Sequence, residues 1–305
     1  MSSDTTDKGA FSDRLIDTVL RTLIGGLMKM PFERRTALMG SVVRKVIGPL
    51  AGYRRRAMKN LALIYPDMAE AERRRIADGV LDNMGRTLIE NYSWRELGER
   101  LQGAPVHGAG LPHIAEAKAA GRPVLFVTGH FSNHEVPRQV LTAMGYEIGG
   151  LYRPMKNKLV NEHYAKTMTE MSGPVFAQGR RGTAGFARHL KSGGMGTLLF
   201  DVAVPEGVLV DFLGREAMTA TSAADIALRM DALVVPYFAV RTANGFEVFI
   251  EEPIAHTDPA TMMTEMTRRL EAHVAAHPEQ WFWVHNRWKP QKARAAATIA
   301  PGPGS

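Results

Sequence analysis

The chain is 305 residues long, and its 45% hydrophobic and 23% charged side chains are ordinary proportions for a globular protein. It contains no cysteine, which excludes disulfides, thiolate nucleophiles and cysteine-bound zinc. The net charge is +7, and residues 1–60 carry 12 basic and five acidic side chains, so the whole excess lies in this segment. A basic N-terminal segment favours an anionic partner, either lipid headgroups or nucleic acid.

Two amphipathic helices are predicted within residues 11–52, after a polar segment, residues 1–10, that we expect to be disordered. Apolar residues recur at helical spacing over residues 15–28 and again over residues 38–47. Such stripes either pack against the core or lie in a lipid interface, where a basic polar face and a large aliphatic face are typical. No stretch reaches the roughly 18 uncharged apolar residues that a membrane span needs, and no signal peptide is recognisable. We therefore expect a protein that is cytosolic or bound to the cytosolic side of a membrane, and the basic charge and the apolar stripes together favour peripheral attachment.

The rest of the chain predicts an α/β fold with a mainly parallel central sheet flanked by helices. Residues 53–100 are expected to be helical, and short apolar runs then alternate with helical stretches, which is typical of a parallel sheet. The expected strands are 123–128, 146–152, 196–200, 233–240 and 246–251. The expected helices are 136–144, 159–171, 182–190, 223–230 and 259–276. We treat residues 53–292 as one domain and residues 293–305 as a flexible tail.

The chemistry is concentrated directly after the first buried strand. His130 follows Gly129, at the carboxyl edge of the sheet, where open α/β sheets bind ligands. Glu135 comes five positions later, across a turn that Ser132 or Asn133 could cap into the next helix. This spacing could place the carboxylate beside the imidazole. A carboxylate that holds one ring nitrogen leaves the other free to accept a proton from an alcohol that attacks a thioester.

This segment resembles a known family. The sequence Gly-His-Phe-Ser-Asn-His-Glu, residues 129–135, is similar to the form GHFGNWE found in the late (lauroyl/myristoyl) lipid A acyltransferases of the lysophospholipid acyltransferase superfamily, and it differs at Ser132 and His134. Four more segments resemble the family in the same order: 56–66, 151–157, 200–214 and 281–289. The resemblance implies a glycerolipid acyltransferase-like fold and His130 and Glu135 as the catalytic pair. It also implies transfer of a fatty acyl group to a hydroxyl of a lipid A precursor or related glycolipid, at the cytoplasmic face of the inner membrane.

The donor implied by the resemblance is a thioester of acyl carrier protein or coenzyme A, with no cofactor and no metal. Four further residues are candidates for substrate binding: Asn133, Arg153, Arg180 and Asp201. The resemblance implies an active-site or phosphate-binding role for Arg153, which follows a strand. Arg180 opens a helix, which suits an anion, although a solvated loop is nearly as well supported.

Asp201 ends a strand on the same sheet edge, where it could pair with an arginine, position the acceptor or simply end the strand. Asn133 could orient the motif or cap a helix. The tryptophans near the C-terminus are expected in the core, whereas Arg287 and Lys289 are expected in solvent or near lipid phosphates.

Several alternatives are open. The acceptor could be a phospholipid or a mannosylated phosphatidylinositol. A metal-dependent lipid hydrolase could use His130, His134 and Glu135 as ligands, although their order does not match the usual helical zinc motifs. A serine hydrolase with Ser132 as nucleophile lacks the flanking glycines of the nucleophile elbow. A binding protein without enzymatic activity is suggested by the basic segment, but no nucleic-acid-reading motif supports nucleic acid as a partner.

Overall fold

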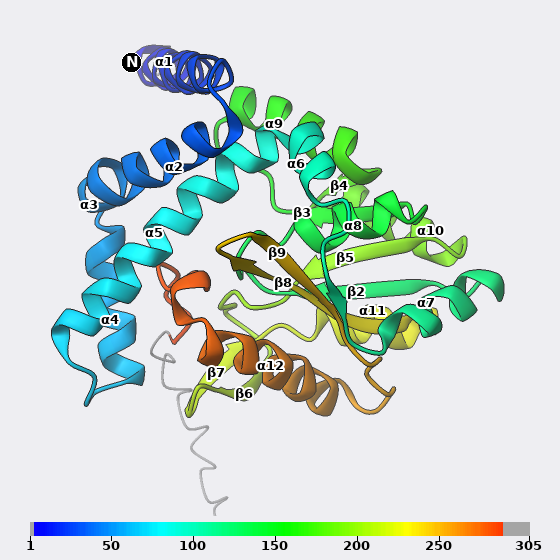
Figure 1. Cartoon of the computed structure of the whole chain (residues 1–305). Coiled ribbons are helices and arrows are strands. Elements are labelled where there is room, and N and C mark those ends of the chain that lie inside the picture. Colours follow the sequence, from blue (N-terminus) through cyan, green and yellow to red (C-terminus); the bar gives the residue numbers. More distant parts are fainter. Residues whose placement is uncertain (1–2, 289–305) are drawn as a thin grey trace, which may run out of the picture.

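The computed structural model describes residues 3–288, with side chains from residue 13 onward, and the predicted tail, residues 293–305, lies outside this range. An N-terminal layer of helices leads into an α/β body (Figure 1). The helices of this layer are α1 (Ser3–Leu27), α2 (Phe32–Val42), a π-helical segment (Val43–Ile47), α3 (Gly48–Leu50), α4 (Tyr53–Ile64), α5 (Glu70–Tyr92) and α6 (Trp94–Arg100).

The first helix begins earlier than the sequence pattern indicates. α1 starts at Ser3 and therefore takes in most of the segment, residues 1–10, that was predicted to be disordered. No proline interrupts residues 3–10, and a helix that has formed one turn extends at little cost because each added residue gains a hydrogen bond. The structure therefore has helix where polarity alone suggested disorder. No helix among the described residues is long and apolar enough to cross a membrane.

The predicted α/β class is confirmed. Seven strands form one sheet in the order β1-β9-β8-β2-β5-β3-β4, and all neighbouring pairs are parallel except β8 with β9. The strands are β1 (Val106–His107), β2 (Val124–Thr128), β3 (Ile148–Tyr152), β4 (Val175–Ala177), β5 (Met195–Leu199), β8 (Leu233–Thr242) and β9 (Gly245–Ile250). The helices that cover the sheet are α7 (Gly110–Ala119), α8 (Val136–Ala143), α9 (Lys158–Ser172), α10 (Arg180–Lys191), α11 (Ser222–Met230) and α12 (Pro259–Ala276). A separate hairpin, β6 (Val208–Phe212) and β7 (Arg215–Thr219), packs on α12 and was not predicted.

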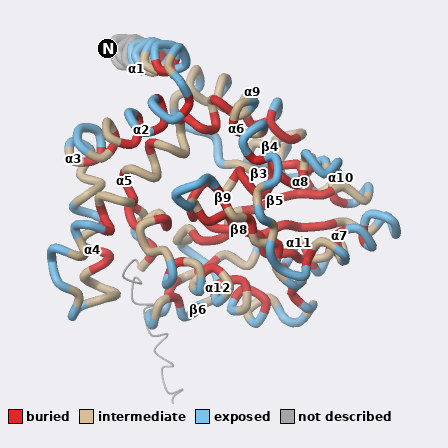
Figure 2. The backbone as a smooth tube through the Cα atoms, in the orientation of Figure 1, coloured by how far each residue is buried: buried red, intermediate tan, exposed pale blue. Residues whose placement is uncertain are grey.

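The central strand β2 is buried along its whole length (Figure 2). Successive side chains of a strand point to opposite faces of its sheet. Leu125 and Val127 accordingly join one hydrophobic cluster, whereas Val124 and Phe126 join the other. Burial on both faces explains why this strand is an unbroken apolar run in the sequence, and it fixes the position of the residues that follow its carboxyl end.

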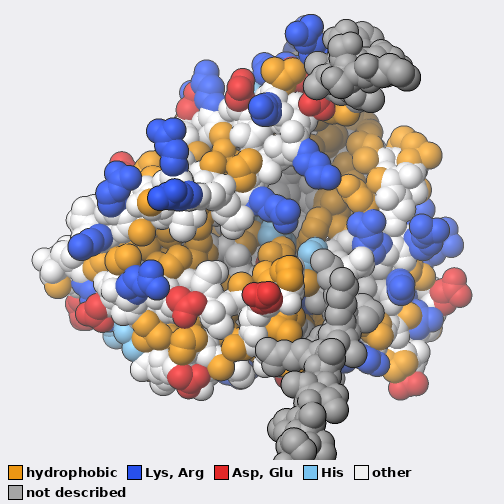
Figure 3. Space-filling view, turned by 180° about the vertical axis from the view of Figure 1, so that it is seen from behind, with side chains coloured by type: hydrophobic (Ala, Val, Ile, Leu, Met, Phe, Trp, Pro, Cys, Tyr) orange, Lys and Arg blue, Asp and Glu red, His pale blue; other side chains and the backbone are white. Residues whose placement is uncertain are grey.

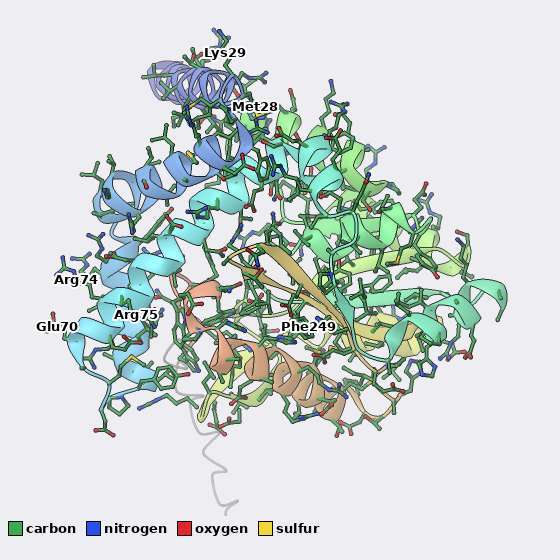
Figure 4. The ribbon with its side chains drawn as sticks, in the orientation of Figure 1. Met28, Lys29, Glu70, Arg74, Arg75 and Phe249 are labelled. Atoms are coloured by element: carbon green, nitrogen blue, oxygen red, sulfur yellow. The ribbon has the colours of Figure 1, made fainter. Side chains whose placement is uncertain are left out.

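The helix α5 runs beside the sheet and carries α2 on its outer side (Figure 1). The two helices approach closely at Gly85, where an added Cβ would lie 2.4 Å from the backbone oxygen of Met39 and 2.8 Å from Cα of Gly40. Both of these atoms belong to backbone, which cannot move aside as a side-chain end can. Gly85 is therefore required by the packing of α2 on α5. Glu70, Arg74 and Arg75, near the start of α5, lie toward the outside of the molecule (Figure 4).

We predict that Gly85→Ala destabilises the protein by about 1–3 kcal/mol, because the added methyl group would force α2 away from α5. The matched control is Gly26→Ala in α1, where nothing lies within 4 Å of the added Cβ. This control should be neutral or stabilising by up to about 1 kcal/mol, since alanine favours a helix over glycine. Urea unfolding measures both changes, and equal midpoints for the two variants would contradict the packing argument.

Candidate active site

His130 and Asp201 form the hydrogen-bonded pair at the centre of the site. The Asp201 Oδ1 atom lies 2.7 Å from Nδ1 of His130. The other carboxylate oxygen accepts from the backbone N–H of His130 at 2.8 Å and from the indole N–H of Trp281 at 3.0 Å. Asp201 is 3% exposed, whereas the His130 ring is 33% exposed. An acceptor on Nδ1 holds the proton there and leaves Nε2 as the basic nitrogen.

The register of the sheet brings these two residues together. Thr128 of β2 lies opposite Leu199 of β5, and the strands are parallel. His130 and Asp201 each follow two residues later, so they leave the same edge of the sheet side by side. Gly129 permits the close approach, because a Cβ on it would lie 3.1 Å from Asp201 Oδ2 and 2.6 Å from a methyl carbon of Leu270.

Opposing effects set the charge of the pair. Burial lowers the pKa of His130, but the negative charge and the hydrogen bond of Asp201 outweigh it and raise that pKa above its ordinary value. Burial by itself would raise the pKa of Asp201. The charge of His130 and the hydrogen bonds from His130 and Trp281 instead hold the pKa of this carboxyl well below its usual range. Asp201 is therefore a carboxylate at neutral pH, and its negative charge favours the protonated form of the His130 ring.

The predicted pairing of His130 with Glu135 is corrected by this geometry. Glu135 is buried and lies 3.2 Å from the Arg138 guanidinium, one helical turn further along the chain. Its backbone N–H donates to the side chain of Asn133. Sequence spacing placed the carboxylate close to His130, but the start of α8 turns it toward Arg138, and the acid that holds His130 comes from the next strand instead. Asp201 was predicted at this edge, although as a substrate-binding residue.

Asn133 anchors the motif in the interior. Its side chain is fully buried and donates to Glu90 of α5 at 3.0 Å. Glu90 in turn makes a two-pronged ion pair with Arg241 of β8, and Arg241 also donates to Asn83. The amide nitrogen of Asn133 donates to Glu90 and its oxygen accepts from the Glu135 backbone N–H, so both amide atoms have hydrogen-bond partners within the protein. This placement favours a role in orienting the loop over contact with substrate.

A cavity of about 190 Å³ opens beside His130. One wall is a face of α5, and the others are the loop that carries His130, Tyr164 of α9 and the segment 280–282. Most of the lining is apolar, and the lining residues are Val80, Asn83, Met84, Thr87, Leu88, Asn91, His130, Ser132, His134, Tyr164, Gln280, Trp281 and Phe282. Figure 3 shows histidine side chains in a hollow of the rear face, with hydrophobic and basic side chains around it. An apolar cavity next to a basic ring nitrogen suits an aliphatic chain.

The two candidate arginines lie along the same sheet edge. Arg153 follows β3 and Arg180 opens α10 after β4, and both are exposed. β3 is two strands from β2, a separation of about 10 Å. The structure therefore brings the predicted arginines to the edge that carries His130, but neither contributes to the cavity lining.

Other expectations near the C-terminus have mixed outcomes. Trp281 and Trp283 are buried, as predicted. The hydrogen bond from the Trp281 indole to Asp201 was not predicted. The position of Trp281 in an aromatic-rich motif was the sequence signal that could have indicated a role at the site. Arg287 was expected in solvent, but it is 1% exposed and donates to the backbone of Met218. Lys289 lies outside the described residues.

The alternative chemistries receive little support from the geometry. Within residues 3–288, no three His, Asp or Glu groups are arranged to hold a metal ion, and Nδ1 of His130 is already committed to Asp201. Ser132 would need a base within hydrogen-bond reach to act as a nucleophile. Its hydroxyl has no hydrogen-bond partner among the described residues.

Comparison with known proteins agrees with the motif. The model of the bacterial lipid A biosynthesis acyltransferase family matches residues 15–290. The chain belongs to this family. The protein is therefore an acyltransferase, and the match includes the N-terminal helices as well as the α/β body.

Individual relatives are distant in sequence but similar over most of their length. A lipid A biosynthesis acyltransferase of Haemophilus influenzae is 26% identical over 265 residues, which is 84% of this chain and 81% of the relative. Lipid A biosynthesis acyltransferase 2 of Shigella flexneri is 23% identical over 90% of each chain. The lipid A biosynthesis lauroyltransferase of Escherichia coli is 26% identical over 76% of this chain and 77% of its own.

We predict that Asp201→Asn and Glu135→Gln have different effects on the pH dependence of acyl transfer. His130 must be neutral to accept a proton, so activity falls as the pH drops through its pKa. Asp201 raises that pKa, and its replacement should move the acidic limb of the profile to lower pH and reduce the maximal rate by about a hundredfold or more. Glu135→Gln should leave the limb in place even if the rate falls. A shifted limb for Glu135→Gln, with none for Asp201→Asn, would restore Glu135 as the partner of His130.

Proposed function

We propose that the protein transfers a fatty acyl group from a thioester donor to a hydroxyl of a lipid A precursor. The observation that carries this proposal is the His130–Asp201 pair, which leaves a basic nitrogen beside an apolar cavity at the carboxyl edge of the sheet. The similar proteins named as lipid A acyltransferases support the choice of acceptor.

The reaction needs one base and no covalent intermediate. Nε2 of His130 takes the proton from the acceptor hydroxyl as its oxygen bonds to the thioester carbonyl carbon. The tetrahedral intermediate then collapses, the carbon–sulfur bond breaks, and the proton on His130 passes to the leaving thiolate. The products are the new ester and the free thiol of acyl carrier protein or coenzyme A. Asp201 stabilises the imidazolium between these two steps.

Arg153 and Arg180 are proposed to bind phosphate groups. Lipid A precursors and acyl carrier thioesters both carry phosphate groups, and guanidinium groups match phosphate oxygens in geometry. Both arginines are exposed at the edge that holds His130. Arg153 is the nearer by strand order and is assigned to the acceptor, with Arg180 as a second contact.

Glu135 is proposed to act indirectly. Its ion pair with Arg138 is buried, and Arg138 also donates to the backbone oxygens of Ile148 and Gly173. The pair therefore joins the start of α8 to the start of β3 and to the end of α9. A substitution of Glu135 would leave a buried guanidinium without its partner and disturb the loop that holds His130.

We further propose that the N-terminal helices attach the protein to an anionic membrane. Among the side chains that the structure describes, 12 large hydrophobic ones are exposed, and eight of them lie within residues 15–50: Leu15, Ile16, Val19, Met28, Leu38, Val46, Ile47 and Leu50. Exposed basic side chains lie on the same elements, among them Arg14, Lys29, Arg34 and Lys45. Met28 and Lys29 both lie where α1 ends (Figure 4). Clustered aliphatic side chains bordered by positive charge suit an acyl and phosphate interface.

Not all of the N-terminal charge is available for lipid. Arg35 is buried and pairs with Glu96, Arg54 pairs with Asp78, and Arg21 pairs with Asp17. The first two pairs join α2 to α6 and α4 to α5, whereas the third lies within α1, and all three engage the cation with the protein rather than with a partner. The attachment therefore depends on the exposed aliphatic residues together with the remaining cations, and less on total charge than the composition suggests.

The central test measures acyl transfer with purified protein, a phosphorylated lipid A precursor and an acyl thioester. We expect transfer by the wild type and a loss of about a hundredfold to ten-thousandfold in His130→Ala. Arg153→Ala should raise the KM for the acceptor and leave the KM for the donor unchanged. The control is Arg229→Ala, because Arg229 is exposed at the end of α11, toward the opposite edge of the sheet. Full activity of His130→Ala, or an acyl group trapped covalently on the enzyme, would refute the mechanism.

Membrane attachment is tested by co-sedimentation with vesicles of anionic or zwitterionic phospholipid. The wild type should bind anionic vesicles and be released by high salt, because screening weakens attraction between charges at a surface. Ile16→Glu and Val19→Glu should each weaken binding by roughly tenfold or more, since each removes an aliphatic side chain from the lipid. Leu209→Glu is the matched control, because Leu209 is similarly exposed but lies on the β6–β7 hairpin. Equal losses in all three variants would show that the N-terminal helices are not the attachment site.

A further inference from the structure

The ring of His134 lies in the cavity beside His130. The two rings are in contact, with centroids 5.6 Å apart and planes inclined at 59°, and both side chains line the cavity. The His134 ring is partly exposed and makes no hydrogen bond to any described residue. Unlike the unpaired oxygens of Ser132 and Asn91, its nitrogens are not sealed within the protein. A ligand in the cavity can therefore reach them.

The His134 ring is uncharged at neutral pH and is a hydrogen-bond donor. Burial lowers its pKa, and the negative charges of Glu135 and Asp201 offset this only in part. A neutral imidazole carries one N–H, and it does not repel the imidazolium that His130 becomes in the proposed reaction. The motif form GHFGNWE has tryptophan where this chain has His134, and tryptophan also carries a ring N–H. The position therefore provides a ring donor in both forms.

Most other donors of the cavity wall are engaged within the protein. Nδ1 of His130 is bonded to Asp201, and the Ser132 side chain is buried. Five further polar side chains of the lining donate to other groups of the protein, and they are Asn83, Thr87, Asn91, Gln280 and Trp281. The Tyr164 hydroxyl accepts from this set, and burial raises its pKa to about 12, so it keeps its proton. Within the described residues, His134 and Tyr164 are thus the lining side chains with a reachable and unpaired donor.

The proposed reaction develops negative charge on the thioester carbonyl oxygen. In the tetrahedral intermediate this oxygen and the acceptor oxygen are bonded to the same carbon, so a group that stabilises the oxyanion must lie beside His130. A hydrogen-bond donor aimed at such an oxygen contributes about a hundredfold to a thousandfold in rate. Of the two unpaired donors, the His134 ring contacts His130, whereas the Tyr164 ring packs beside Tyr92 with centroids 6.1 Å apart. The position of His134 is therefore the one that fits the oxyanion.

We propose that His134 is a further catalytic residue, whose ring N–H donates to the thioester carbonyl oxygen and stabilises the oxyanion of the tetrahedral intermediate. The inference rests on the proposed function, with His130 as the base and a thioester as the acyl donor. His134 neither gains nor loses a proton. Its hydrogen bond strengthens as the carbonyl π electrons move onto oxygen, and it weakens when they return and the carbon–sulfur bond breaks.

The test compares kcat and KM for acyl transfer in variants of His134. His134→Phe keeps an aromatic ring but loses the N–H, so kcat should fall by about a hundredfold to a thousandfold. The KM for the thioester should stay within roughly threefold, because the lost bond is strong only in the transition state. His134→Gln keeps an N–H donor and should recover about tenfold or more of the loss. The matched control is His107→Phe, which should retain wild-type activity, because His107 is exposed on β1 at the far edge of the sheet.

Binding of two ketone analogues of the thioester provides a readout without turnover. In one analogue a methylene group replaces sulfur and the carbonyl stays planar. In the other a difluoromethylene group replaces sulfur, and the carbonyl is hydrated to a tetrahedral gem-diol. By calorimetry, the wild type should bind the gem-diol more tightly by roughly threefold to tenfold, the value of one hydrogen bond. His134→Phe should bind both analogues alike, and its retained affinity for the planar ketone shows that it is folded.

Tyr164, the other unpaired donor, is the competing candidate for the oxyanion. A larger loss of kcat in Tyr164→Phe than in His134→Phe would assign the oxyanion to the tyrosine and overturn the role of His134. The same role is overturned if His134→Phe retains kcat within about threefold of the wild type, or if folded His134→Gln recovers nothing. A wild type that transfers no acyl group refutes the proposed function instead. In that case the binding comparison still decides whether His134 donates to a tetrahedral oxygen.

Discussion

One carboxylate determines the geometry of the whole site. Asp201 accepts the His130 backbone N–H, the His130 ring and the Trp281 indole at once. Two of these donors belong to His130 in the loop after β2, and the third belongs to Trp281 in the C-terminal segment. A buried carboxylate is tolerated only when its oxygens are satisfied, so the three donors cannot move apart without a large cost in free energy.

The C-terminal segment closes this arrangement from the other side. Phe131 and Trp281 form an antiparallel bridge, the Phe282 N–H donates to the His130 carbonyl, and the Ser132 N–H donates to that of Gln280. The loop after β2 is thus held as a short strand would be, rather than as a free turn. Beneath it, Glu90 and Arg241 form an ion pair that joins α5 to β8. Removal of either partner would leave a buried charge, so this pair ties the position of α5, and with it a cavity wall, to the sheet.

The sequence predicted correctly the features that depend on residues close together in the chain. Alternating strands and helices predicted the α/β class, and the strand that ends at Thr128 placed His130 at the correct edge. The choice between Glu135 and Asp201 could not be made this way, because it depends on which strand lies beside β2. Strand order is a tertiary property, and β5 follows β2 by nearly 70 residues. Arg287 was misjudged for a similar reason, since its burial depends on the unpredicted β6–β7 hairpin, whose β7 strand accepts its hydrogen bonds.

The apolar stripe of α1 packs on the core along only part of its length. Ile24 and Leu27 are buried in the core, whereas Ile16 and Val19 are more than half exposed. Asp17 lies between these groups on α1 and is buried, so the part of the helix that faces the protein at this point is polar. This leaves the neighbouring aliphatic side chains on the outside, which is the arrangement that a lipid-facing helix requires.

The buried side chain of Asp17 connects α1 to the cavity through neighbouring residues. Asp17 lies 3.3 Å from the His163 ring on α9, and that ring is 2.7 Å from the hydroxyl of Tyr92 on α5. The next residue on α9, Tyr164, and the preceding residue on α5, Asn91, both line the cavity and are hydrogen-bonded to each other. Two pairs of adjacent residues therefore join the helix proposed to bind lipid to the wall of the cavity proposed to hold an acyl chain. The contacts therefore form a continuous line of side chains from Asp17 on α1 to Tyr164 and Asn91 at the cavity.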